Sequence, residues 1–155
     1  MTDTALSKVA IIGIGLIGAS IALAARHHKS ESRIALYDRD EAVCKTAQDL
    51  NIGDEICADS AACVADADLV ILAVPVGAMK AVMNEIKDHL KKGAIITDTG
   101  STKRSVIRDI GPLIPNTCHL VAGHPLAGTE FSGPEAGFPS LFDGRYWLII
   151  PGEAP

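Results

Sequence analysis

Short apolar runs alternate with amphipathic segments along most of the sequence. The apolar runs are rich in Val, Ile and Leu and have the length of buried strands; they cover residues 8–12, 33–37, 55–57, 68–74, 93–97, 118–122 and 146–150. The segments between them predict helices over residues 16–27, 41–50, 61–65, 76–90 and 103–110. Strands that alternate with helices predict an α/β fold with a doubly wound, mostly parallel sheet and right-handed crossovers.

The longest predicted helix, residues 76–90, has one apolar face. Met79, Val82, Met83, Ile86 and Leu90 recur along it at helical spacing. This stripe predicts a helix that packs on the sheet, with its methionines filling the core rather than forming a cofactor site.

The size and charge of the chain limit the classes of protein that it can represent. With 155 residues, 48% of them hydrophobic, the sequence can bury one core, so we expect a single domain over residues 1–155. The formal net charge is −5 and Lys and Arg do not cluster, which argues against nucleic acid or an anionic membrane surface as a partner. A protein that binds a small molecule fits this composition better.

Cysteine usage and the first apolar stretch both bear on the cellular compartment. The four cysteines, at positions 44, 57, 63 and 118, form no C-x-x-C pair and no metal-like grouping with histidine. We therefore expect reduced, mostly buried cysteines in a cytoplasmic protein without a metal site. The uncharged stretch from Val9 to Ala25 is short, is divided by three glycines and follows no basic segment, so it predicts neither a membrane helix nor a secretion signal.

Three glycines follow the first predicted strand in the spacing G-x-G-x-x-G. Gly13 permits a sharp turn, Gly15 lets the backbone approach a pyrophosphate, and Gly18 lets the next helix pack closely on its strand. The start of that helix, which includes Leu16 and Ile17, offers free N–H groups to phosphate. The motif predicts a dinucleotide site on a Rossmann-type sheet; a glycine turn in another βαβ protein is the alternative.

An acidic residue stands where such a fold binds the adenine ribose. Asp38 ends the second predicted strand, twenty positions after Gly18, where a carboxylate accepts hydrogen bonds from ribose hydroxyls and repels a 2′-phosphate. The sequence therefore predicts NAD rather than NADP, although Arg39 can stack on adenine or tolerate a phosphate. Three residues follow the fourth strand: Ala73, Val74 and Pro75. We expect their backbone and small apolar side chains to contact the ribose and the nicotinamide.

Two further loops at the carboxyl ends of predicted strands carry candidate chemistry. Ser101 follows the fifth strand and either faces the nicotinamide, caps the next helix, or does both. His124 lies in a loop predicted after the sixth strand, where its imidazole can take a proton near neutral pH; a hydrogen-bonded structural histidine is the alternative. Glu130 either orients that imidazole, meets substrate or lies on the surface. Asp98 and Lys103 are interpreted as helix-end or ion-pair residues rather than as catalytic groups.

Five segments carry a resemblance to a known family: 13–20 (G-I-G-L-I-G-A-S), Asp38, 73–75 (A-V-P), 98–103 (D-T-G-S-T-K) and 124–130 (H-P-L-A-G-T-E). Together they strongly resemble the prephenate and arogenate dehydrogenases. The first three motifs are shared by many related dehydrogenases, whereas the Gly-Ser loop joined to G-H-P-x-A-G-T-E is specific to this family. The resemblance extends over essentially the whole chain, through 141–144 (L-F-D-G) and the last predicted strand.

The resemblance implies an NAD-linked oxidative decarboxylation of prephenate or arogenate in tyrosine biosynthesis. It makes His124 the catalytic histidine and Ser101 its assistant and a substrate ligand, and it puts Glu130 at the substrate entrance, with Thr129 beside it in the substrate-binding set. His124 would accept the ring hydroxyl proton as hydride leaves the same carbon, and loss of carbon dioxide then yields the aromatic ring.

Family members usually continue into a mostly helical C-terminal domain that supplies dimer contacts and cationic groups for the substrate carboxylates. This chain ends before such a domain, which suggests a truncated form or a fragment. We therefore expect a full-length homodimer, and a 155-residue chain that binds NAD but turns over substrate weakly or not at all.

Two other functions are compatible with the glycine loop. One is a stand-alone NAD-binding or redox-sensing module that performs no chemistry, in which His124 is dispensable. The other is a different dehydrogenase or an imine reductase of the same superfamily, which shares the glycine loop but not the segment 124–130. That segment favours the prephenate or arogenate interpretation without distinguishing the two substrates.

Overall fold

The computed structural model describes residues 6–150, which form a sheet with the strand order β3-β2-β1-β4-β5-β6-β7. The strands are β1 Lys8–Ile12, β2 Arg33–Tyr37, β3 Glu55–Ile56, β4 Leu69–Leu72, β5 Ile95–Asp98, β6 His119–Pro125 and β7 Trp147–Ile150. All neighbouring pairs from β3 to β6 are parallel, and β7 is antiparallel to β6. The first six strands have the order of a doubly wound dinucleotide-binding sheet, which confirms the predicted fold class.

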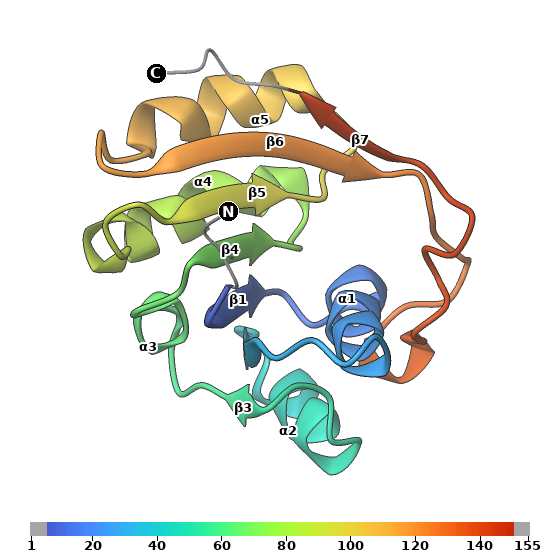
Figure 1. Cartoon of the computed structure of the whole chain (residues 1–155). Helices are drawn as coiled ribbons and strands as arrows, with labels where there is room; N and C mark the ends of the chain where they lie inside the picture. The colour runs from blue at the N-terminus through green and yellow to red at the C-terminus, as the bar shows by residue number, and fades with distance from the viewer. Residues whose placement is uncertain (1–5, 151–155) are drawn as a thin grey trace, which may run out of the picture.

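Helices cover both faces of this sheet (Figure 1). Their bounds are α1 Leu16–His27, α2 Glu41–Asp49, α3 Ser60–Val64, α4 Val76–Ile86 and α5 Lys103–Ile110, with 3₁₀ turns η1 Lys87–His89, η2 Gly111–Leu113 and η3 Pro134–Ala136. Helices α1 and α2 contribute to one apolar core, and α3, α4 and α5 contribute to a second core on the opposite face. No helix within residues 6–150 is both long enough and apolar enough to cross a membrane.

Local sequence patterns predicted most element boundaries closely, and the differences have physical causes. The predicted bounds of α1, β2 and α5 are confirmed. Helix α4 ends at Ile86, four residues earlier than predicted, because the chain tightens into η1. Strand β6 continues to Pro125 rather than ending at Ala122, because β7 pairs with Ala122–Pro125 along its whole length.

The predicted core stripe of α4 is confirmed. Met79, Met83 and Ile86 are buried between α4 and the sheet, with Val82 and Leu90 packed against them. Cysteines at 57, 63 and 118 are also buried, and Cys44 is half-buried; all four are free thiols. Burial raises the pKa of the Cys63 thiol, so this side chain behaves as a small apolar residue.

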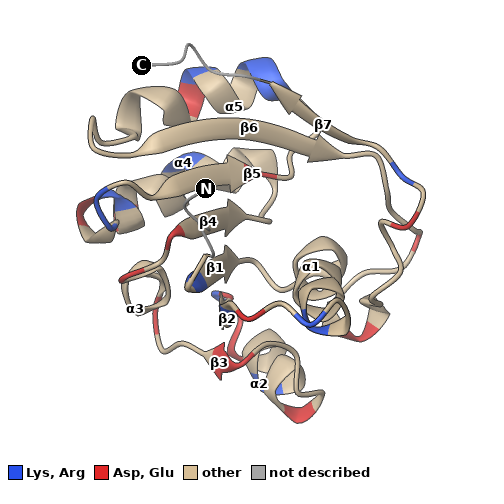
Figure 2. Ribbon diagram, viewed as in Figure 1, with Lys and Arg blue, Asp and Glu red and all other residues tan. Residues whose placement is uncertain are grey.

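Strand β7 forms one edge of the sheet and is apolar throughout. It contains no charged residue (Figure 2), and its side chains, Trp147, Leu148, Ile149 and Ile150, are exposed in the described part of the chain. Tyr146, just before it, is the most exposed of these large apolar residues. The edge next to β6 therefore presents apolar surface to solvent, which is uncommon for an edge strand.

Asp68 joins three segments at the amino ends of the central strands, and it makes folding sensitive to acid. Its carboxylate accepts hydrogen bonds from the Ser7 and Lys8 backbone N–H groups, at 2.7 and 3.1 Å, and from Lys91 Nζ at 2.5 Å. The Lys91 hydrogen bond first, and then that of Lys8, hold the pKa of Asp68 below its ordinary value of 3.8. The stabilisation is therefore complete above the ordinary pKa and is lost as the pH falls through the lowered one.

We expect Asp68→Asn to lower stability at pH 7 and to flatten the acid-induced decline. Urea denaturation followed from about pH 5 to about pH 2 measures both effects, because the carboxylate titrates in that range. The exposed carboxylate of Asp143 provides the control, since Asp143→Asn should leave the pH profile as it is. An Asp68→Asn profile parallel to that of the unchanged protein would contradict the prediction.

Candidate functional site

The glycine motif forms the turn between β1 and α1, and each glycine has a distinct environment. Gly13 has a φ of +98°, and a Cβ atom there would lie 2.5 Å from the Ala73 carbonyl oxygen. A Cβ on Gly18 would lie 2.0 Å from the Gly13 carbonyl oxygen, whereas a Cβ on Gly15 would meet no atom within 4 Å. The predicted turn at Gly13 and close packing at Gly18 are confirmed. Gly15 faces open space.

The start of α1 suits an anion. Gly15 is the N-cap residue, so no side chain caps the helix, and the first turn contains no acidic residue. The first backbone N–H groups of an uncapped helix need partners, and their partial positive charge attracts phosphate. Together with the open side of Gly15, these features fit the pyrophosphate of a dinucleotide.

A cavity of about 290 Å³ lies beside this turn, at the carboxyl ends of β1, β2 and β4 and along α4. Seven of the predicted cofactor residues line it: Gly13, Gly15, Asp38, Arg39, Ala73, Val74 and Pro75. The three others, Leu16, Ile17 and Gly18, belong to the first turn of α1 and do not line it. The remaining lining residues are Ile12, Tyr37, Ala78, Ala81, Val82 and Glu85.

Asp38 is held in a fixed orientation at this cavity. One carboxylate oxygen, Oδ2, accepts a hydrogen bond from the Ile14 N–H at 2.9 Å, and Oδ1 accepts one from the Asp40 N–H at 3.0 Å. Each carboxylate oxygen has a second lone pair, so both can still accept from hydroxyl groups. The carboxylate is therefore preorganised between the glycine turn and α2.

Ser101 lies on the loop after β5 and is exposed. The N-cap residue of α5 is Thr102, and its side chain makes no capping hydrogen bond. The predicted capping role for Ser101 is therefore wrong, because α5 begins one residue later than that role requires. The prediction that Ser101 faces a nicotinamide stays a prediction.

His124 lies inside β6 rather than in the predicted exit loop, because its backbone pairs with Leu148 of β7. The side chain is half-buried, and its Nδ1 atom is buried without a hydrogen-bond partner within residues 6–150. Buried polar atoms in folded proteins are nearly always paired. A structural histidine would have such a partner, so this orphan nitrogen favours a histidine that meets a group from outside the described residues.

A buried carboxylate connects the segments that carry Ser101 and His124. Asp98 is fully buried at the end of β5, and it accepts hydrogen bonds from the Gly100 N–H at 2.9 Å and the Gly123 N–H at 3.1 Å. Lys103 Nζ donates both to Asp98 Oδ2 and to the Gly123 carbonyl oxygen. The predicted ion-pair role of Asp98 and Lys103 is confirmed, and it joins the loop after β5 to the residue that precedes His124.

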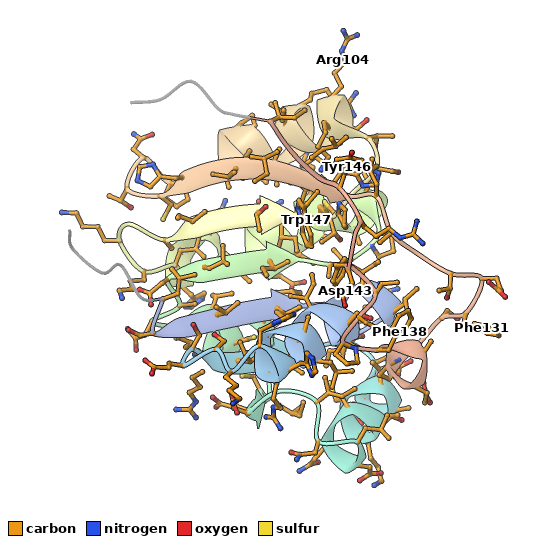
Figure 3. All side chains as sticks on the ribbon, turned by 45° about the vertical axis from the view of Figure 1, so that its right-hand side comes forward. Arg104, Phe131, Phe138, Asp143, Tyr146 and Trp147 are labelled. Atoms are coloured by element: carbon orange, nitrogen blue, oxygen red, sulfur yellow. The ribbon has the colours of Figure 1, made fainter. Side chains whose placement is uncertain are left out.

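The other predicted substrate residues lie on the segment 126–146, which connects β6 to β7 and includes η3. Thr129 and Glu130 are both exposed, and the Thr129 hydroxyl oxygen accepts a hydrogen bond from the Phe131 N–H at 3.1 Å. The loop returns to α1, where the Phe138 N–H donates to the Ser20 hydroxyl oxygen at 3.1 Å. Figure 3 shows Phe131 and Phe138 on this loop, and Tyr146 and Trp147 where it joins β7. Glu130 does not hydrogen-bond His124 Nδ1.

The sequence prediction missed the contribution of α4 to the cavity. Ala78, Ala81 and Glu85 recur at helical spacing and form a second stripe, and Val82 lies at the border between this stripe and the buried one. The first stripe stood out because its residues are large and apolar. The sequence signal for the second stripe is weaker, because most of its side chains are small and its last residue carries a carboxylate.

Comparison with known proteins identifies the family. The sequence model of the prephenate dehydrogenase nucleotide-binding domain matches residues 21–155. The chain belongs to the prephenate dehydrogenase family. A cyclohexadienyl dehydrogenase of Zymomonas mobilis is 45% identical over 148 residues, which cover 96% of this chain and 50% of that protein. A prephenate dehydrogenase of Bacillus subtilis is 32% identical over 99% of this chain and 40% of its own length.

Solved structures of the prephenate dehydrogenase family have the same fold. The prephenate dehydrogenase of A. aeolicus, in complex with hydroxyphenyl propionate and NAD⁺, superimposes with a TM-score of 0.88 at 28% identity, over 98% of this chain and 53% of that one. The arogenate dehydrogenase of Synechocystis gives a TM-score of 0.84 at 27% identity, over 94% of this chain and 50% of that one. The chain thus spans about half the length of these relatives.

Proposed function

We propose that this chain is the dinucleotide-binding part of an NAD-dependent prephenate or arogenate dehydrogenase. The observation that carries the proposal is the position of His124. It lies near the carboxyl end of β6, in the strand beside the Ser101 segment, and its buried Nδ1 has no hydrogen-bond partner among residues 6–150. Ligands of doubly wound sheets bind at this edge. The A. aeolicus relative, whose structure contains NAD⁺, supports the choice of cofactor.

The residues of the cavity have complementary roles in this proposal. The open side of Gly15 and the uncapped start of α1 receive the pyrophosphate, and Asp38 accepts hydrogen bonds from the adenine ribose. The same carboxylate disfavours a 2′-phosphate, which supports NAD over NADP. The bound nicotinamide supplies a hydride acceptor.

His124 and Ser101 would act on the substrate. Neutral His124 accepts the proton of the ring hydroxyl as hydride leaves the carbon that carries it, and Ser101 hydrogen-bonds that hydroxyl or the imidazole. Carbon dioxide loss then completes the aromatic ring. Thr129 and Glu130 lie near the end of the same strand, which supports their assignment to the substrate entrance.

The extent of the chain bears on its partners. The relatives are about twice as long, and we propose that their additional half supplies the cationic groups for the substrate carboxylates and the contacts of a homodimer. Residues 1–155 then form one cofactor-binding domain of a cytoplasmic enzyme with a small-molecule substrate.

We expect the 155-residue chain to bind NAD and to form NADH from prephenate or arogenate weakly or not at all. Calorimetry measures the first quantity, and absorbance of NADH measures the second. His124→Ala should leave NAD affinity unchanged, because His124 does not line the cavity, and should remove any turnover that is present. His119→Ala, at the exposed start of the same strand, is the matched control.

The outcomes separate the alternatives. Absence of NAD binding would overturn the proposal. Strong turnover by the chain would show that it contains a complete active site and that the additional half of the relatives is not needed. Turnover that survives His124→Ala would instead favour another dehydrogenase chemistry on the same fold.

A further inference from the structure

The part of the cavity that the ribose and pyrophosphate do not explain is formed by α4, Arg39 and Tyr37. Gly13 and Gly15 suit the pyrophosphate, and Asp38 suits the ribose next to it. In a dinucleotide the adenine base follows that ribose. The remaining cavity-lining side chains at this end come from α4, from Arg39 and from Tyr37.

The surface that α4 presents there is apolar except at one end. Ala78, Ala81 and Val82 provide small or medium apolar side chains that suit the face of a planar ring. Glu85 is the last residue of this stripe, and it is the second carboxylate of the cavity besides Asp38. An ionised carboxylate only accepts hydrogen bonds, so this end of the cavity selects a group that donates them.

The Glu85 carboxylate is held in place by a neighbouring helix. Ser60, a buried residue at the start of α3, donates a hydrogen bond from its hydroxyl group to Glu85 Oε2 at 3.1 Å. Tyr37 lies close by, since burial first and then the negative charge of Glu85 raise the pKa of its hydroxyl group. Tyr37 therefore stays protonated and neutral at pH 7.

We propose that Glu85 recognises the adenine base by accepting a hydrogen bond from its exocyclic amino group. This inference rests on the proposed function, because it assigns a base-reading residue to the same dinucleotide site. A base with a carbonyl at that position, such as hypoxanthine, brings an oxygen acceptor against the carboxylate and is disfavoured. Glu85 thus determines which purine base the site accepts, while Asp38 selects a ribose with free hydroxyl groups over one with a 2′-phosphate.

The test compares NAD with nicotinamide hypoxanthine dinucleotide, in which a carbonyl replaces the 6-amino group and N1 carries a proton. Calorimetry gives the dissociation constant of each for the unchanged chain and for Glu85→Gln. Because Glu85 is exposed, solvent weakens a hydrogen bond to its carboxylate, and we expect the unchanged chain to bind NAD about three- to tenfold more tightly. In Glu85→Gln the ratio should fall close to one, because the glutamine amide both donates and accepts.

Two further variants make the result decisive. Glu85→Ala removes the acceptor altogether and should also reduce the ratio, so it serves if Glu85→Gln does not fold. Asp88→Asn changes an exposed carboxylate one turn further along, outside the cavity, and should keep the ratio of the unchanged chain.

Equal affinity of the unchanged chain for the two dinucleotides would overturn the inference while leaving the proposed function intact. Retention of the full ratio in Glu85→Gln or Glu85→Ala would do the same. Absence of NAD binding by the unchanged chain would overturn the proposed function, and this inference with it.

Discussion

Replacement of Asp98 by alanine is expected to lower the free energy of unfolding by about 3–5 kcal/mol, because it breaks a buried ion pair and leaves one partner uncompensated. The Asp98 side chain is fully buried, and the Lys103 side chain is 13% exposed. The change also leaves the Gly100 and Gly123 N–H groups without their acceptor. Urea denaturation at pH 7, followed by circular dichroism, measures the loss.

Two comparisons test whether this loss comes from the buried pair. Asp49→Ala removes the carboxylate of an exposed pair with Lys45 and should cost about 0.5 kcal/mol or less. The double change Asp98→Ala with Lys103→Met should be less destabilising than Asp98→Ala alone, because it removes the unpaired charge as well. If Asp98→Ala lowers the free energy of unfolding by less than about 1 kcal/mol, the buried Asp98–Lys103 ion pair contributes little to stability and the prediction is wrong.

Gly18→Ala and Gly15→Ala are expected to have opposite effects on stability and on cofactor binding. The Gly18 Cβ atom would lie 2.0 Å from the Gly13 carbonyl oxygen, and backbone cannot move aside as a flexible side chain does. We expect a loss of about 1–3 kcal/mol or more, as in other overpacked sites. Gly15 has a φ of −78° and open space at its Cβ position, so Gly15→Ala should fold normally.

The same open space makes Gly15→Ala the more severe change for NAD binding. A methyl group there occupies the approach of the pyrophosphate to the backbone, and we expect at least about a tenfold loss of affinity by calorimetry, equivalent to about 1.4 kcal/mol. Gly77→Ala, in α4 with equally open surroundings, is the control and should preserve both stability and affinity. A Gly15→Ala chain with unchanged NAD affinity would place the pyrophosphate elsewhere.

Local sequence patterns correctly predicted those helices and strands whose bounds depend on residues close to them in the sequence. The bounds 33–37 and 16–27 follow from a β-branched run and from a glycine turn that begins an apolar helix, and the structure has both. The doubly wound, mostly parallel sheet follows from the alternation of strands with helices, since right-handed crossovers leave few arrangements. These features need no information about distant contacts.

The rest of the site depends on contacts between residues far apart in the sequence. His124 is part of a strand only because Leu148, 24 residues later, pairs with it. The hydrogen bonds that connect Asp98 to Gly123 cross 25 positions. The sequence did not indicate Glu85 for a different reason: the neighbouring residues of its stripe on α4 are small, and only the folded structure brings Glu85 into the same cavity lining as the glycine turn.

The cavity lining is confined to the segment from Ile12 to Glu85, whereas Ser101, His124 and Glu130 all follow it in the chain. Because polypeptides emerge from the ribosome amino end first, every residue that contacts the cavity is synthesised before the residues assigned to the chemistry. A dinucleotide that occupies the cavity would favour the folded state of this earlier part by mass action. The nascent chain would then gain a stabilising ligand at a stage when β6 and β7 have yet to join the sheet.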